Sequence, residues 1–330
     1  AIEVLMLDLT SQSLLPLLIS AVTGTLLSYF FLGKSVMFNA IHSVPDFELG
    51  NLPFYALLGL FAGLLSVYFM RTTQSIEHRF TLIKKKWLKT AIGGVVLSGL
   101  IFMFPSFFGE GYDSIADILV GRSDSIFYNS PLYIFKYNDY TYLIFILALL
   151  LFKPLATAFT GVAGGVGGVF APLLFIGGIA GFFIVSIFNV FFGMELSVIN
   201  FTLAGMAGLM GSVMKAPLTA IFLIAEVSRG YQLFIPLIIT TVISYIVFYP
   251  FEKYSIYTKS LALQGDLITH DKNKHALSKI NVMSMIEDDF KTIPPHATIK
   301  DITLLIQDSN RNVFPVVDQH SLFYGVILLD

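Results

Sequence analysis

The sequence of 330 residues contains no cysteine, which excludes disulfides, thiolate metal sites and cysteine nucleophiles. It is also poor in charge, because only 13% of its residues are Asp, Glu, Lys or Arg, about half the share in an ordinary soluble domain. The formal net charge of -2 argues against nucleic-acid binding. Hydrophobic residues make up 55% of the chain. A soluble enzyme could not cover that much apolar surface, so we expect lipid to surround most of the chain.

The few charges gather toward the C-terminal end. Residues 1–264 hold 27 of the 42 charged side chains, and residues 265–330 hold the other 15. The second part therefore has the charge density of a soluble domain. We expect an integral, multi-pass membrane domain over residues 1–264, a linker over 265–281 and a small soluble domain over 282–330.

The apolar segments of the first part differ in length. About 20 apolar residues cross the hydrocarbon core of a bilayer. Segments of that order lie at 12–32, 52–70, 88–108, 141–160 and 232–250. Shorter pieces, interrupted by Gly and Pro, lie at 169–190, 199–212 and 216–227. Interrupted helices are typical of transporters, because unwound backbone within a membrane is stable only where it lines a cavity.

Segment 71–87 mixes charged and apolar residues and ends in a lysine cluster at 84–86. This pattern predicts an amphipathic helix that ends at a membrane interface, on the cytoplasmic side. A solvated linker is the alternative.

A run of glycines is the most informative stretch. Five of the eight residues 161–168 are Gly, and each Gly destabilises a helix by about 1 kcal/mol, so we expect extended backbone there. Close helix packing through small residues is the alternative explanation. Pro172 suits the first turn of a new helix. A helix that begins within the membrane presents free N–H groups and a positive dipole end, which can bind an anion. The candidate donors are the N–H groups of Val169 and Phe170.

The stretch 167–172, Gly-Gly-Val-Phe-Ala-Pro, resembles the GxFxP anion motif of the CLC chloride channels and chloride/proton exchangers. Other stretches that resemble this family are 153–158, 204–208, 215–221 and 255–258. The resemblance implies an all-α polytopic membrane fold with inverted repeats and broken helices. It also implies a homodimer in the lipid bilayer, joined through the membrane helices at 12–32 and 216–250.

The resemblance implies transport of chloride or similar small anions, with no other cofactor. The implied anion ligands are the N–H groups of Val169 and Phe170 and the hydroxyl of Tyr257. Gly167, Gly168 and Pro172 would shape the anion loop. On this interpretation the site contains no lysine or arginine, because backbone dipoles and a hydroxyl replace them.

Two further motifs of the family, GSGIP and GREGP, do not occur in the sequence. We expect both upstream of Ala1, so that the chain lacks the first part of its first repeat and holds half of the anion site.

The resemblance leaves the transport mechanism open. Bacterial exchangers of the family have two adjacent acids in the stretch that resembles the start of this sequence. Glu3 matches the first acid, and Val4 occupies the position of the second. Valine cannot carry a proton, which favours a passive channel over the alternative, an anion/proton antiporter. Glu3 either belongs to a proton pathway or is held by structural hydrogen bonds.

Two other functional classes fit poorly. An enzyme is not expected, because the sequence has no HExxH motif and its six histidines show no other ligand spacing of that kind. A non-transporting membrane receptor is a remote alternative, since a receptor does not need broken, glycine-rich helices.

Residues 282–330 resemble an incomplete CBS domain, through Val282-Met283-Ser284, Thr292-Ile293-Pro294-Pro295 and Phe314-Pro315-Val316-Val317-Asp318. We predict a short strand near 290–293, a helix over 298–309 and strands over 313–317 and 322–328. Thr298 and Asp301 would begin the helix. The resemblance implies a cytoplasmic location. Nucleotide binding is not expected, because the domain is cut before its last helix and no second copy follows.

Overall fold

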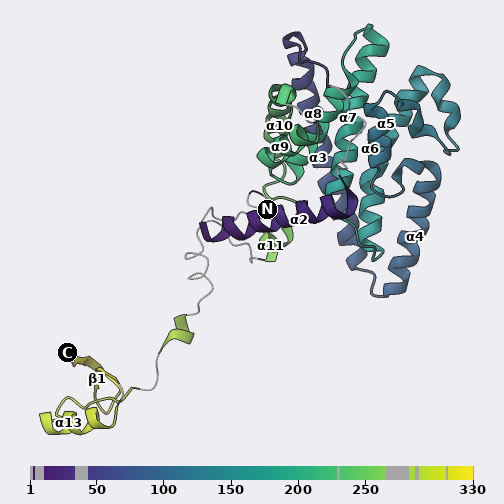
Figure 1. Cartoon of the computed structure of the whole chain (residues 1–330). Helices are drawn as coiled ribbons and strands as arrows, with labels where there is room; N and C mark the ends of the chain where they lie inside the picture. Colours follow the sequence, from purple (N-terminus) through teal and green to yellow (C-terminus); the bar gives the residue numbers. More distant parts are fainter. Residues whose placement is uncertain are drawn as a thin grey trace. The chain divides into compact units, whose positions relative to one another are not determined.

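The computed structural model describes residues 3, 11–33, 44–228, 231–264, 282–286, 290–309 and 311–329. The chain forms two units, Ala1–Leu267 and Ile268–Asp330 (Figure 1). In its described residues the first unit is helical. Six of its helices are long and apolar enough to cross a membrane.

The longer helices have these bounds: α2 Ser11–Leu32, α3 Leu52–Thr81, α4 Lys86–Met103, α6 Asp139–Val162, α7 Phe170–Phe192 and α10 Phe234–Phe248. The shorter α-helices of this unit are α5 Tyr112–Leu119, α8 Val198–Val213, α9 Pro217–Val227 and α11 Lys259–Gln264. Short 3-10 turns lie at η1 Leu49–Asn51, η2 Pro105–Phe107, η3 Ser123–Phe127, η4 Tyr133–Tyr137, η5 Tyr231–Leu233 and η6 Val282–Met285.

Most of the predicted helices are confirmed, and three segments differ. Segment 71–87 is not a separate helix, because α3 continues to Thr81 and α4 begins at Lys86. No Gly or Pro interrupts this segment, and Thr73 and Ile76 continue the buried stripe of α3. The segment predicted as a short broken piece at 169–190 forms α7, which is 23 residues long.

α4 ends earlier than the predicted 108. Its last residue is Met103, and Phe104 has the non-helical angles φ -128° and ψ 81°. Phe104 precedes Pro105, and the residue before a proline is sterically pushed away from the helical region.

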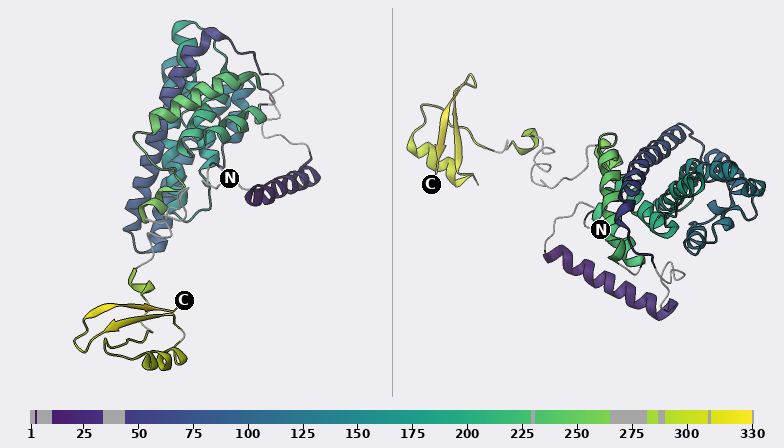
Figure 2. Two further views of the ribbon diagram at one scale, coloured as in Figure 1. Left: turned by 90° about the vertical axis from the view of Figure 1, so that its left-hand side faces the viewer. Right: turned by 90° about the horizontal axis from the view of Figure 1, so that it is seen from above.

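The centre of the first unit is the contact between α7 and α8, while α3, α6 and α7 run side by side (Figure 2). Glycines allow the close approach of α7 and α8. A Cβ atom at Gly205 would lie 2.2 Å from the carbonyl oxygen of Gly177, and one at Gly181 would lie 1.9 Å from that of Phe201. These helices therefore pack backbone against backbone, as small residues permit in membrane proteins.

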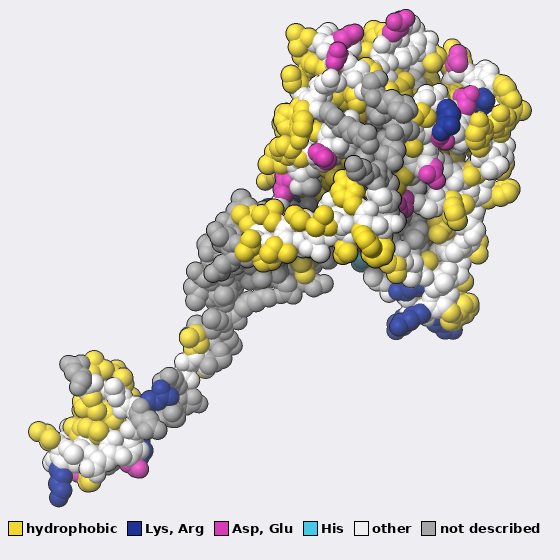
Figure 3. Space-filling view, viewed as in Figure 1, with side chains coloured by type: hydrophobic (Ala, Val, Ile, Leu, Met, Phe, Trp, Pro, Cys, Tyr) yellow, Lys and Arg dark blue, Asp and Glu magenta, His cyan; other side chains and the backbone are white. Residues whose placement is uncertain are grey.

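The outer surface of this unit is apolar. Hydrophobic side chains cover much of the face seen in Figure 3. On α2, Leu15, Leu26 and Phe30 are exposed, and the helix has no polar side that would face water. Exposed hydrophobic groups also follow α9 and α10, among them Leu218, Phe222, Ile235, Val242 and Ile246. A surface of this kind is stable against lipid or another apolar surface rather than water.

In its described residues the second unit contains a small sheet and one α-helix. Strands β1 Val313–Val317 and β2 Phe323–Leu328 pair antiparallel, and Ile293 bridges Val316 in parallel. Helix α13 spans Ile299–Gln307. The carboxylate of Asp301 accepts hydrogen bonds from the N–H and hydroxyl of Thr298, and these bonds lower the pKa of Asp301. The predicted strands at 313–317 and 322–328 and the predicted helix start are confirmed, and the helix ends two residues early. The strand predicted near 290–293 is wrong, because only Ile293 pairs there, through a single bridge.

The packing of α7 on α8 generates a stability prediction. Gly205→Ala should lower the free energy of unfolding by about 2–3 kcal/mol, because its methyl group overlaps the Gly177 carbonyl. Thermal denaturation in detergent measures the change. The control is Gly94→Ala on α4, where a Cβ atom meets nothing within 4 Å and a gain of about 0.5–1 kcal/mol follows from Gly-to-Ala exchange in a helix. Equal melting temperatures for the two variants would contradict this account of the interface.

Candidate anion site

The glycine run ends α6 and turns the chain. Gly164 has φ +92°, in the left-handed region that glycine tolerates. The N–H of Gly165 donates to the carbonyl of Thr160 at 2.9 Å, which is the 6→1 bond of a Schellman motif. Residues 165–168 then have no regular secondary structure. The predicted loss of helix is confirmed for 165–168, while Gly161 and Val162 still belong to α6. The irregular segment lies between two helices of membrane-spanning length.

α7 begins at Phe170, so Pro172 lies in its first turn as predicted. The first backbone bond of this turn runs from the N–H of Leu173 to the carbonyl of Val169 at 3.0 Å. The N–H groups of Val169, Phe170 and Ala171 precede this bond and have no partner within the helix. No side chain caps the helix. The start of α7 therefore offers free donors and the positive end of the helix dipole.

A cavity of about 570 Å³ lies at this start. Its lining includes all five of the predicted residues from the glycine run and α7, namely Gly167, Gly168, Val169, Phe170 and Pro172. The other walls come from α3, α4, α6 and the turn between η2 and α5. The structure thus brings the predicted loop to a hollow large enough for a small anion and its water. The assignment of the Val169 and Phe170 N–H groups as anion ligands stays a prediction.

Lys153 of α6 lines the same cavity, so the expectation that the site contains no lysine or arginine is wrong. Its side chain is buried at 3% exposure. Its Nζ donates to the Phe107 carbonyl at 3.3 Å and lies 4.7 Å from the ring centre of Phe175. Among the described residues, no carboxylate oxygen lies within 4.0 Å of Nζ. Lys153 is therefore a buried cation without an ion-pair partner there.

Two carboxylates also line the cavity, those of Glu77 on α3 and Glu110 in the turn before α5. Both residues are exposed. Within the described part of the chain, neither forms an ion pair with Lys153. The cavity consequently combines one buried positive charge with two carboxylates that water reaches.

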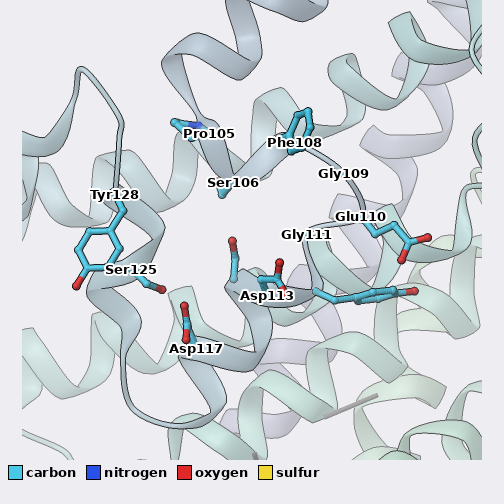
Figure 4. A pocket seen from close by; sticks show the side chains of 12 residues that line it. Pro105, Ser106, Phe108, Gly109, Glu110, Gly111, Asp113, Asp117, Ser125 and Tyr128 are labelled. Atoms are coloured by element: carbon cyan, nitrogen blue, oxygen red, sulfur yellow. The ribbon is translucent and has the colours of Figure 1, made fainter. Parts of the chain in front are cut away.

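A second cavity, of about 490 Å³, adjoins the first (Figure 4). Both cavities share the turn that contains Phe108, Gly109 and Glu110. Asp113 and Asp117 add further carboxylates to the second cavity, which makes it unsuited to anions. In the described residues, no three His, Cys, Asp or Glu side chains are grouped to hold a metal ion.

Tyr257 lies just before α11 and does not line either cavity. Its side chain is 40% exposed, and no described residue hydrogen-bonds its hydroxyl. Desolvation raises the pKa of this phenol, so the hydroxyl keeps its proton at neutral pH and remains a donor. Its predicted role as an anion ligand is not decided by its position.

Glu3 lies at the start of another helix, α9. Its carboxylate accepts hydrogen bonds from the N–H of Leu218 at 3.1 Å and the N–H of Thr219 at 2.7 Å. The Thr219 hydroxyl donates to the same oxygen at 2.7 Å. A carboxylate at this end satisfies donors and complements the helix dipole. Of the two predicted roles of Glu3, the described contacts support structural hydrogen bonding.

The family model "Voltage gated chloride channel" matches residues 1–249. Curated relatives include the chloride channel protein CLC-e of Arabidopsis thaliana, which is 29% identical over 243 residues. That match covers 67% of this chain and 31% of the relative. The voltage-gated ClC-type chloride channel ClcB of Salmonella typhimurium is 27% identical over 263 residues, covering 79% of this chain and 58% of the relative. The chain thus spans between about a third and three fifths of these relatives.

Solved structures show the same fold. A slow cyanobacterial Cl-/H+ antiporter aligns with a TM-score of 0.55 at 21% identity, over 74% of this chain and 53% of the other. A CLC-type fluoride/proton antiporter aligns with a TM-score of 0.56 at 23% identity, over 78% of this chain and 58% of the other. The predicted CLC-type helical fold is confirmed.

The contacts of Glu3 generate a prediction for α9. Glu3→Ala leaves two backbone donors without their acceptor and should lower the free energy of unfolding by about 1–2 kcal/mol. Thermal denaturation in detergent measures the loss. Glu195→Ala is the matched control, because Glu195 is exposed. If Glu3→Ala and Glu195→Ala have the same melting temperature, Glu3 does not cap α9.

Proposed function

Since this chain belongs to the voltage-gated chloride channel (CLC) family, we propose that the full-length protein moves chloride or similar small anions across a membrane. The family and the six apolar helices make it an integral, multi-pass membrane protein. The proposed anion ligands are the N–H groups of Val169 and Phe170, with the hydroxyl of Tyr257 as a further donor.

Lys153 is the observation that carries this proposal. Moving an ammonium group out of water costs several kcal/mol unless a partner compensates it. In the described residues Lys153 has a carbonyl and two aromatic rings as partners, which do not neutralise its charge. The free N–H groups of α7 add positive potential to the same cavity. An anion that enters the cavity compensates both the charge of Lys153 and the positive potential of these N–H groups, so the site favours negative charge.

A buried ammonium and backbone N–H groups recognise charge and size and provide no stereospecific contacts. This chemistry fits a small, mobile inorganic anion. It provides neither a nucleophile with its base nor a metal site, which supports transport as the function.

Two other features belong to the proposal. The exposed apolar faces of α2, α9 and α10 would form a homodimer interface within the bilayer, with a separate pore in each subunit. The second unit would be the first part of a cytoplasmic CBS domain, which agrees with its sheet and helix.

Removing the charge of Lys153 tests the function. In the full-length protein, Lys153→Met should weaken chloride binding by about 1–3 kcal/mol, or about five- to 150-fold, because a positive charge near the anion is lost. Isothermal calorimetry and chloride efflux from liposomes measure the effect. Lys136→Met is the control, since Lys136 pairs with Asp124 at 2.9 Å and does not line the cavity. Wild-type chloride affinity and efflux in Lys153→Met would argue against this site.

The proposed mechanism is passive conduction, which Val4 supports because it replaces an acid of the family's exchangers. Anion/proton antiport is the second candidate, supported by the carboxylates of Glu77 and Glu110 in the cavity and by two solved neighbours that are antiporters.

Proton movement separates the two mechanisms. A chloride gradient across liposomes that contain the full-length protein should drive no proton uptake, as a pH-sensitive dye reports. A known proton ionophore serves as the positive control. Uphill proton movement with a fixed chloride stoichiometry would establish antiport instead.

A further inference from the structure

A buried carboxylate outside the anion cavity anchors the segment that contains Tyr257. Glu252 is 7% exposed. One of its oxygens lies 2.5 Å from the Nζ of Lys259, and the other lies 3.6 Å from the Nε of Arg71. Glu252 and Lys259 lie on either side of Tyr257 in the sequence, so this ion pair closes a loop of the six residues 253–258 between them.

The loop is attached to one face of α3. Lys259 also donates to the side-chain oxygen of Gln74 at 2.5 Å. Arg71 and Gln74 are three residues apart and therefore share a helix face. Met70, one residue before Arg71, packs with Val67, Phe248 and Ile256 in a small apolar cluster. Both ends of the loop are thus bound to α3, through charge and through apolar contact.

Within the loop, further bonds hold the backbone. Ser255 and Thr258 bond reciprocally, since the N–H of each donates to the hydroxyl oxygen of the other at 3.2 Å. The N–H of Ile256 donates to the Val213 carbonyl at 3.2 Å. Nζ of Lys215 reaches the Lys253 carbonyl at 2.7 Å. The backbone on both sides of Tyr257 is therefore fixed, while its own side chain remains 40% exposed and its hydroxyl has no described partner.

We infer that Glu252 is a positioning residue for anion binding, which fixes the turn of Tyr257 against α3 and thereby holds the phenol hydroxyl in place as a donor. The inference rests on the proposed role of Tyr257 as an anion ligand. A rigid, ion-paired loop with one unbonded hydroxyl is an arrangement that orients a donor in advance and lowers the entropy lost on binding. A hydroxyl on an unanchored loop would contribute little to affinity.

A double-mutant cycle in the full-length protein tests the inference. Chloride affinity is measured by calorimetry for the wild type, Glu252→Gln, Tyr257→Phe and the double variant. Tyr257→Phe should weaken binding about fivefold, the effect of losing one hydrogen bond. Glu252→Gln should weaken it by a similar factor, and the double variant should be no weaker than Tyr257→Phe. Asp308→Asn is the matched control, because its exposed ion pair with Lys291 lies in the second unit.

Three outcomes would contradict the inference about Glu252 in different ways. If Tyr257→Phe alone weakens binding, the tyrosine assignment holds and the role of Glu252 is wrong. If the two effects multiply, Glu252 acts independently of Tyr257, and the inference is again wrong. If Tyr257→Phe binds chloride normally, the tyrosine assignment is wrong and the inference about Glu252 falls with it. Gln74→Ala, which removes one attachment of Lys259 without stranding a buried charge, replaces Glu252→Gln if that variant does not fold, and the same three outcomes apply.

Discussion

The unwound backbone between α6 and α7 is the constraint on which the rest of the first unit depends. In lipid, every peptide N–H and C=O needs a partner, so a break between two helices is costly unless protein or water surrounds it. Here the break is stabilised at one end by the bond from Gly165 to Thr160, and Thr90 of α4 donates its hydroxyl to the Ala163 carbonyl at 2.8 Å. At the other end the first residues of α7 line a cavity.

That constraint also explains the packing around the break. A polar cavity within an apolar bundle is stable only if its walls stay in place. α7, which supplies one wall, is held against α8 at backbone distance by Gly177, Gly181 and Gly205. The ring centres of Phe107 and Phe175 lie 5.2 and 4.7 Å from the Nζ of Lys153. Glycine therefore has two roles here: it unwinds the chain at 164–168, and it removes side-chain volume within α7 and α8.

The sequence predicted what depends on local chemistry. The apolar runs, the glycine run, Pro172 in a first helical turn and the start of α13 at Thr298 each follow from a few neighbouring residues, and the structure confirms them. The continuation of α3 to Thr81 was missed, because the exposed charges of that segment concealed its buried stripe. Lys153 was missed for a related reason. Its burial comes from the η2 turn and α7, which are distant in sequence, and a lone lysine beside a proline gives no sign of such neighbours. Only its own position, within an apolar run, could have drawn attention to it.

The short turn before α5 separates two compartments of different chemistry. Phe108, Gly109 and Glu110 border the hollow with the buried lysine on one side and the acid-lined hollow on the other. Because this turn is only a few residues long, a change in it affects the cavities on both sides. Any substitution at Glu110 changes the electrostatic potential of both cavities together. The effect of such a substitution therefore cannot be assigned to one cavity alone.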